Sequence, residues 1–241
     1  MKKKESNAQR FINAYNEIDY AIRVQHGFKR SMSFSDVIRR AVPLNYLIRK
    51  YEDDLIDFGR LRNAIIHGGN DEYVIAEPHL DVVEKIEKLA NSITTPPKAI
   101  DVVGKKDVLC AQYDLYLIDL IVLISTSKYS NIPIYKNGGL IGITNGQRIL
   151  DYLGKAIEDN KNIDQYIKTT KIEEILSPEV LNKYYEVVDI NATIEKVLNI
   201  FYANRKTNAV LITKTGAITE VPLGIVTASD VITLNNILDN Y

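Results

Sequence analysis

The chain has 241 residues, of which 46% are hydrophobic and 25% charged, a balance typical of a folded protein with one large or two small domains. With a formal net charge of −1, the molecule has no overall field that would draw it to nucleic acid or to a membrane surface. The single cysteine, Cys110, excludes an internal disulfide and a cysteine-rich metal site, so we expect a cytoplasmic protein without a bound metal.

The start of the chain lacks the apolar segment of a signal peptide. The longest apolar run, residues 115–124, is too short to span a bilayer, so we expect no membrane partner. A first helix is predicted to end near His26, because apolar side chains recur at helical spacing in Phe11, Tyr15, Ile18 and Ile22. Ser33 and Ser35 then precede a short predicted helix over residues 36–42, which Pro43 stops.

A single long helix is expected next, because one face of the pattern collects Leu47, Tyr51, Leu55, Phe58 and Ile65 before Gly68 and Gly69. A last helix is predicted over residues 79–93. Pro96 and Pro97 follow it and mark the best linker in the chain. Four or five helices in this span predict a small helical bundle over residues 1–95.

Late in the long helix, Arg62 and Asn63 are followed after three residues by His67. An imidazole titrates near neutrality and can act as acid or base, and a guanidinium is a permanent cation suited to a phosphate. Residues five positions apart point about 140° away from each other on a helix. Arg62 and His67 therefore share a site only if the helix end distorts or a second subunit completes it. Arg60 has an equally suitable spacing to His67.

This pattern resembles the Arg-x4–6-His motif of the HEPN superfamily. The resemblance implies a helical domain that pairs as a homodimer, contacts RNA and cleaves it without a metal ion. Arg62, Asn63 and His67 would then be the catalytic residues, with Arg62 on the scissile phosphate and His67 at the ribose 2′-hydroxyl or the leaving group. Two simpler interpretations stay open: an ion pair of Arg62 with Asp57 or with the run Glu52-Asp53-Asp54, and His67 as a residue favoured at a helix C-terminus. The eleven Lys or Arg against four acids in residues 1–50 fit contact with RNA, and they fit equally well a contact with the acidic half of the same domain in another subunit.

A repeat fills the rest of the chain. Apolar residues at helical spacing in Leu117, Leu120, Ile121 and Ile124 align with Ile194, Val197, Leu198 and Phe201. A short predicted strand follows each helix, over residues 132–135 and 209–212, and a glycine-bearing turn follows each strand. The repeated unit is therefore predicted to be strand, helix, strand, turn, strand, helix.

The second copy ends its last strand in the stretch Gly224-Ile-Val-Thr-Ala-Ser-Asp230, which leads into an apolar helix. Thr227 and Asp230 thus place a hydroxyl and a carboxylate at a helix N-terminus, where free backbone N–H groups favour anions. In the first copy the same frame has Asn145 in place of the threonine and Arg148 in place of the aspartate. Helix capping without any ligand would also explain Thr227 and Asp230.

This repeat resembles a tandem CBS pair (Bateman module), and the resemblance covers about the last three-fifths of the chain. It implies an α+β fold: an N-terminal helical bundle followed by two β-α-β-β-α units. The expected domains are residues 1–95 and 96–241, with the first CBS unit over about 100–157 and the second over about 171–241.

The CBS resemblance implies a site for an adenine nucleotide (AMP, ADP or ATP) as regulatory ligand. Asp230 would hold the ribose hydroxyls, Thr227 would lie near the phosphates, and Ala209, Val210 and Val187 would line the site. The first site is expected to be altered, because an arginine side chain such as Arg148 cannot accept a hydrogen bond from ribose.

Two functions are compatible with the sequence. In one, the nucleotide-sensing CBS pair controls a HEPN-like endoribonuclease in a homodimer. In the other, the protein is a nucleotide-binding regulator without catalysis, and its helical domain docks a partner or drives dimerisation.

Overall fold

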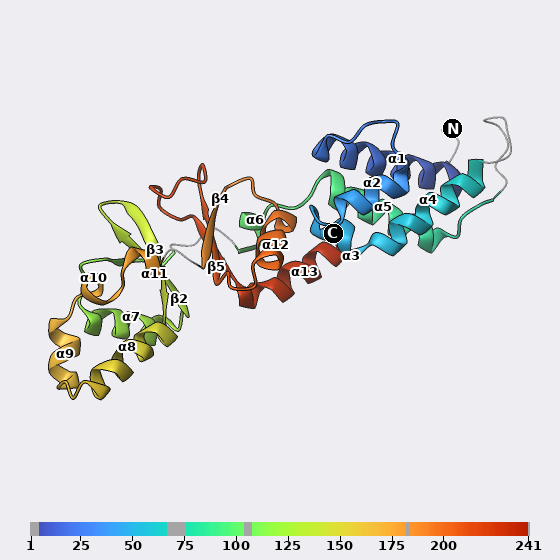
Figure 1. The fold of residues 1–241 in the computed structure, drawn as a ribbon. Helices are drawn as coiled ribbons and strands as arrows, with labels where there is room; N and C mark the ends of the chain where they lie inside the picture. Colours follow the sequence, from blue (N-terminus) through green and yellow to red (C-terminus); the bar gives the residue numbers. More distant parts are fainter. Residues whose placement is uncertain (1–4, 67–75, 104–107, 182–183, 241) are drawn as a thin grey trace. The chain divides into compact units, whose positions relative to one another are not determined.

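The computed structural model describes residues 5–66, 76–103, 108–181 and 184–240. The architecture is α+β, as the sequence predicts: the N-terminal part is helical, and the C-terminal part combines two small sheets with helices (Figure 1). One compact unit comprises the chain before Lys98 with Thr193–Asn199 and the end of the chain from Thr233. The other comprises Lys98–Ala192 and Ile200–Ile232. The domain boundary near residue 95 stays a prediction.

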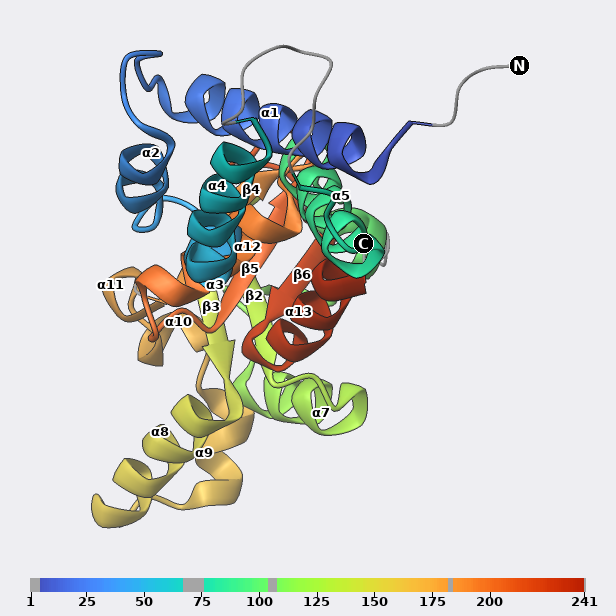
Figure 2. The same ribbon diagram turned by 90° about the vertical axis from the view of Figure 1, so that its right-hand side faces the viewer.

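The N-terminal helices are α1 (Asn7–His26), α2 (Phe34–Ala41), α3 (Tyr46–Lys50), α4 (Glu52–Ile66) and α5 (Leu80–Thr94). Helix α1 packs along α5, and α2 packs against α4 (Figures 1 and 2). The predicted apolar stripe of α1 is buried, and the ring of Phe11 meets that of Phe58 edge to face with centroids 5.8 Å apart. Burial of these apolar side chains is what stabilises the bundle.

We expected a single helix over residues 47–65. This prediction is wrong in one respect, because the structure has two helices, α3 and α4, separated by Tyr51. Tyr51 leaves the helical conformation, with φ −112° and ψ 25°. The short α3 before it has its own cap, since the buried side chain of Asn45 accepts a hydrogen bond from the Ile48 N–H at 3.0 Å. Three acidic residues then open α4, where the helix dipole favours negative charge.

The C-terminal part repeats one sheet topology, as the sequence predicts. The first sheet has β1 (Ala111–Gln112), β2 (Asn131–Lys136) and β3 (Gly139–Asn145), and the second has β4 (Tyr185–Asp189), β5 (Ala209–Thr213) and β6 (Gly224–Thr227). In both sheets the first pair is parallel and the second antiparallel. The helices of the repeat are α7 (Leu117–Ser127) and α8 (Gly146–Glu158) in the first copy, and α12 (Ile194–Ala203) and α13 (Val231–Asn240) in the second.

The two sheets differ in the length of their first strand. All five residues of β4 pair with β5, whereas β1 pairs only with Ile134 and Tyr135 of β2. Pro133 precedes this pair and has no N–H to donate. The parallel ladder of the first sheet therefore begins only after the proline.

Each copy is completed by the segment that leads into the other. Helix α6 (Ala99–Val103), before the first copy, packs on β6, and the Ala99 N–H donates to the Ala192 carbonyl at 2.9 Å. Before the second copy, the segment with α10 (Ile172–Ile175) and α11 (Pro178–Leu181) buries Ile172, Leu176 and Leu181 in the core of the first. The sequence pattern indicated none of these helices, nor α9 (Ile163–Thr169), because they are too short to show a period.

An apolar layer joins the two sheets. Tyr135, Leu140 and Ile143 of the first sheet form one buried cluster with Ala209 and Leu211 of the second. Within the described residues, no helix has the length and apolarity needed to cross a bilayer.

Candidate functional site

The polar end of strand β6 folds back on its own backbone. The Thr227 N–H donates to Oδ2 of Asp230 at 2.7 Å, and the Thr227 hydroxyl donates to the same oxygen at 2.8 Å. That hydroxyl accepts in turn from the Ser229 hydroxyl, 2.7 Å away. A 3₁₀ turn, Ala228–Asp230, leads from here into α13. One carboxylate and two hydroxyls therefore meet at the start of a helix, where the dipole favours negative charge.

Ala209 lies beside this junction, because it pairs with Thr227 across the antiparallel ladder of β5 and β6. Val187 packs on the same apolar layer between the sheets as Ala209. Val210 is one residue further along β5, and strand alternation turns its side chain to the opposite face. The structure thus brings Ala209 and Thr227 together, keeps Val187 in their layer, and directs the Val210 side chain away.

The corresponding junction of the first copy is filled by contacts of the chain itself. Asn145 caps α8, with its Oδ1 accepting from the Arg148 N–H at 3.0 Å. The Arg148 guanidinium donates to the Ile143 carbonyl at 2.6 Å and lies over the ring of Tyr184, 5.3 Å from its centroid. Burial lowers the pKa of Arg148 below its ordinary value. A guanidinium with these contacts presents no acceptor to a ribose diol.

The second candidate site, in the helical bundle, is described only in part. Arg62 and Asn63 lie near the end of α4, and His67 falls outside the described residues. The Arg62 guanidinium lies 5.8 Å from the centre of the Tyr15 ring, and its Nη1 donates to the Asn63 side chain at 3.4 Å. Its buried Nε has no hydrogen-bond partner among the described residues. Burial raises the pKa of Tyr15 to about 12, so the ring under Arg62 is a neutral phenol at pH 7.

The simpler interpretation of Arg62, an ion pair with Asp57, is not what the described residues form. Asp57 pairs instead with Arg60, 2.8 Å away and largely exposed. The Arg62 guanidinium therefore contacts the Tyr15 ring of α1 and the side chain of Asn63. Its Nε–H has no hydrogen-bond partner among the described residues.

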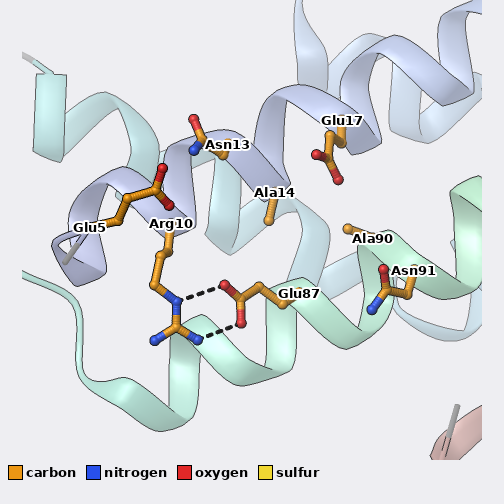
Figure 3. Close-up of a pocket in the computed structure, with 8 residues that line it drawn as sticks. All are labelled: Glu5, Arg10, Asn13, Ala14, Glu17, Glu87, Ala90 and Asn91. Atoms are coloured by element: carbon orange, nitrogen blue, oxygen red, sulfur yellow. Dashed lines mark hydrogen bonds and ion pairs between the residues drawn. The ribbon is translucent and has the colours of Figure 1, made fainter. Parts of the chain in front are cut away.

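A hollow of about 340 Å³ lies between α1 and α5 (Figure 3). Its arginine is already satisfied inside the protein, since Arg10 donates to both carboxylate oxygens of Glu87 at 2.8 and 2.6 Å. Figure 3 shows this pair bridging the two helices, with Glu5 and Asn13 along the wall. The contact joins α1 to α5 and leaves the Arg10 charge compensated.

Sequence reasoning missed two residues of the repeated junctions. Ser229 is the third polar group at the end of β6, and its place two residues after Thr227 was a usable signal. Tyr184 carries the Arg148 guanidinium, and no local pattern marks it, because it stands 36 residues further along the chain.

Residues 172–235 match the family model of the CBS domain. The chain therefore contains a CBS domain, and the matched span holds the junction of Thr227 and Asp230. A search of curated proteins found no relative of this chain.

Solved structures of CBS domains resemble the C-terminal part. A CBS domain of a membrane protein from Sphaerobacter thermophilus shares 14% identity and a TM-score of 0.48, covering 64% of this chain and 97% of its own. A CBS domain-containing protein from Bacillus anthracis str. Ames Ancestor shares 16% identity and a TM-score of 0.44, covering 58% and 92%. The CBS domain of a bacterial CNNM/CorC family Mg²⁺ transporter, solved in complex with ATP, shares 20% sequence identity with a TM-score of 0.44. The match covers 63% of this chain and 94% of that domain.

Proposed function

We propose that this protein is a regulator whose CBS pair senses an adenine nucleotide (AMP, ADP or ATP) at the junction of β6 and α13. The observation that carries the proposal is the cluster of Thr227, Ser229 and Asp230 at a helix start, inside the span that matches the CBS domain. Asp230 accepts hydrogen bonds from the ribose hydroxyls, and Thr227 turns its hydroxyl to the phosphates. Ala209 and Val187 supply apolar surface next to them.

One nucleotide binds per chain under this proposal. The first-copy junction has no carboxylate where the second has Asp230, and the guanidinium of Arg148 there is engaged by the Ile143 carbonyl and the Tyr184 ring. A carboxylate can accept the two hydrogen bonds of a diol and a guanidinium can accept none, so the two copies differ in the property that ribose recognition requires.

Titration calorimetry with AMP, ADP and ATP tests this function. The wild-type chain is expected to bind at least one of them with a stoichiometry near one per chain. Asp230→Ala should weaken binding by about 1.5–3 kcal/mol for each hydrogen bond to the charged carboxylate that it removes. Asp164→Ala is the matched control, because it deletes an exposed aspartate that forms an ion pair with Lys168 of its own helix. Equal affinity in wild type and Asp230→Ala would remove Asp230 from the site.

The helical domain is the output of this sensor in our proposal. Its candidate activity is metal-independent RNA cleavage of the HEPN type by Arg62, Asn63 and His67, in a homodimer that completes the site. The unpartnered Nε of the Arg62 guanidinium supports this assignment, because a buried donor without a partner costs free energy unless it has a ligand or a further protein group to bind.

A regulator without catalysis is the second candidate function. It is favoured by the contact of Arg62 with the Tyr15 ring, since that contact alone can account for the arginine as part of the bundle's packing. In this version the helical domain docks a partner or drives dimerisation, and purified protein leaves RNA intact.

A further inference from the structure

Helix α3 holds the far end of α13. The Lys50 ammonium and the Tyr51 hydroxyl both bind Oδ1 of Asp239, at 2.6 and 2.7 Å. One turn earlier on α13, the Tyr46 hydroxyl donates to the side chain of Asn235. We call these residues, with Arg49, the α3 clamp: Tyr46, Arg49, Lys50 and Tyr51.

The clamp also reaches α12. Arg49 donates to Oδ1 of Asn199 at 3.4 Å, and Asn199 donates to Glu195 at 2.6 Å. Burial raises the pKa of Glu195, while hydrogen bonds from Asn199 and from the backbone of Tyr46 act in the opposite direction. Helix α3 therefore contacts polar groups on both helices of the second copy of the repeat.

The first copy has no such polar groups at the matching positions. In the repeat alignment, Asn199 corresponds to Val122, Asn235 to Leu153 and Asp239 to Ile157. Val122 and Ile157 are 53% and 61% exposed. The residues that take hydrogen bonds from α3 thus occur only in the copy that also keeps the carboxylate of Asp230. The clamp and the candidate nucleotide site belong to the same copy.

A single helix connects the two features. Helix α13 runs without interruption from Val231, next to Asp230, to Asn240, next to Asp239. The two aspartates are nine positions apart in the sequence, which is about 14 Å along a helix axis. In the arrangement held by the clamp, Oδ2 of Asp230 is taken by the N–H and the hydroxyl of Thr227. A ribose hydroxyl that binds this oxygen must compete with Thr227 for it, and a shift of the first turn of α13 is carried along the stiff helix.

We infer that the α3 clamp opposes nucleotide binding, by holding α13 in the position in which Thr227 occupies Asp230. Lys50 and Tyr51 are positioning residues in this scheme, because they act on the site only through α13. The inference rests on the proposed nucleotide site. By linkage, a nucleotide that moves α13 must weaken the clamp by the same factor by which the clamp weakens nucleotide binding. The clamp is thereby the route from the nucleotide to the helical bundle that contains α3.

Calorimetry on the full chain tests the inference with the tightest-binding of AMP, ADP and ATP. The double variant Lys50→Met/Tyr51→Phe removes both donors to Asp239 and keeps the size of both side chains. It should bind the nucleotide about fivefold more tightly or better, the lower end of typical couplings between sites. Lys50→Arg, which keeps a charged donor, should bind as wild type does.

Lys85→Met is the matched control, because Lys85 forms an ion pair of equal length, 2.6 Å, with Asp54 of α4, inside the helical bundle. It should leave the affinity unchanged. An affinity of the double variant that equals the wild-type value, or lies below it, overturns the inference while leaving the nucleotide site standing. Wild-type protein that binds none of the three nucleotides overturns the site and the inference together.

The reciprocal effect gives a second readout on unaltered protein. Nucleotide should speed amide hydrogen exchange in α3, whose last turn the clamp contacts hold in place. In Lys50→Met/Tyr51→Phe this exchange should already be fast and should not respond to nucleotide. Unchanged exchange of α3 in saturated wild-type protein would contradict the coupling.

Discussion

At Gly142, strand β3 has no room for a side chain. An added Cβ would lie 2.3 Å from the Cβ of Leu181 and 2.6 Å from its carbonyl group, both in the segment that leads to the second copy. Backbone cannot yield as the end of a flexible side chain can. Gly142→Ala should therefore destabilise the protein by about 1–3 kcal/mol, the cost of overpacking a core, in urea unfolding.

Gly154 supplies the control for this prediction. It lies inside α8, and an added Cβ would meet no atom within 4 Å. Gly154→Ala should be neutral or should stabilise by about 0.4–1 kcal/mol, because alanine restricts the unfolded chain. Equal unfolding midpoints for the two variants would disprove the contact at Leu181.

Arg148 gives a prediction that separates structure from ligand binding. Arg148→Met keeps the length of the side chain but removes the hydrogen bond to the Ile143 carbonyl and the charge over Tyr184. Stability should fall by about 1–2 kcal/mol, and nucleotide affinity should stay as in wild type. Loss of nucleotide binding in a folded Arg148→Met protein would show that the first junction is itself part of the site.

Single residues mark the limit of what the sequence can predict. It indicated that Thr227 and Asp230 are helix-capping types, and both do take part in a cap. It could not indicate that both Thr227 donors reach one oxygen of Asp230, because that depends on side-chain rotamers. Likewise the partner of Arg148 could not be inferred, since Tyr184 is brought to it by the packing of a distant segment.

Among the helices and strands, long periodic segments were predictable and short ones were not. The stripes of α1, α7 and α12 stand at the expected residues, because 3.6-residue periodicity needs several turns to show. The break between α3 and α4 was missed, since Tyr51 fits the apolar face of a continuous helix. Its hydroxyl instead binds Asp239, a contact between residues 188 positions apart.

This contact between α3 and α13 predicts a pH dependence of stability. Burial alone would raise the pKa of Asp239, but hydrogen bonds from Lys50 and Tyr51 hold it below its ordinary value. A carboxyl whose pKa is lowered on folding stabilises the protein above its unfolded pKa, about 3.9, and that contribution is lost as the pH falls through the folded pKa.

Asp239→Asn should therefore melt at a lower temperature than wild type at pH 5–7, and the difference should disappear in more acidic buffer below the folded pKa. The effect should stay within about 1 kcal/mol, because the carboxyl is 40% exposed and solvent screens the ion pair. Thermal melts followed by circular dichroism across this pH range provide the measurement. A constant difference at every pH would show that the effect of the substitution is not electrostatic.

For the whole molecule, the α+β fold and the repeated sheet could be predicted because two copies of one pattern support each other. The role of the helical bundle could not be predicted, because arginine and histidine, as at Arg62 and His67, also occur in helical bundles as packing and capping residues. An activity assay can therefore distinguish the proposed nuclease from the non-catalytic regulator, whereas the sequence pattern cannot.

That assay is cleavage of a labelled single-stranded RNA pool by the purified protein in EDTA, with and without nucleotide. The nuclease proposal predicts cleavage that changes with nucleotide and is lost in Arg62→Ala and His67→Ala, with nucleotide affinity intact. Each substitution should lower the rate by about 10²–10⁴-fold, as for the loss of an acid, a base or a charge-stabilising group. Intact RNA with wild-type protein under all conditions would favour the non-catalytic regulator.

The exchange of leading segments between the two copies constrains how this gene could have changed. The second copy's α10 and α11 fill the core of the first, and α6 before the first copy packs on β6 of the second. A recombination event that transplanted one copy alone would leave apolar core residues without their cover on both sides of the cut. We therefore expect the two copies to fold together and to be transferred between genes as one unit.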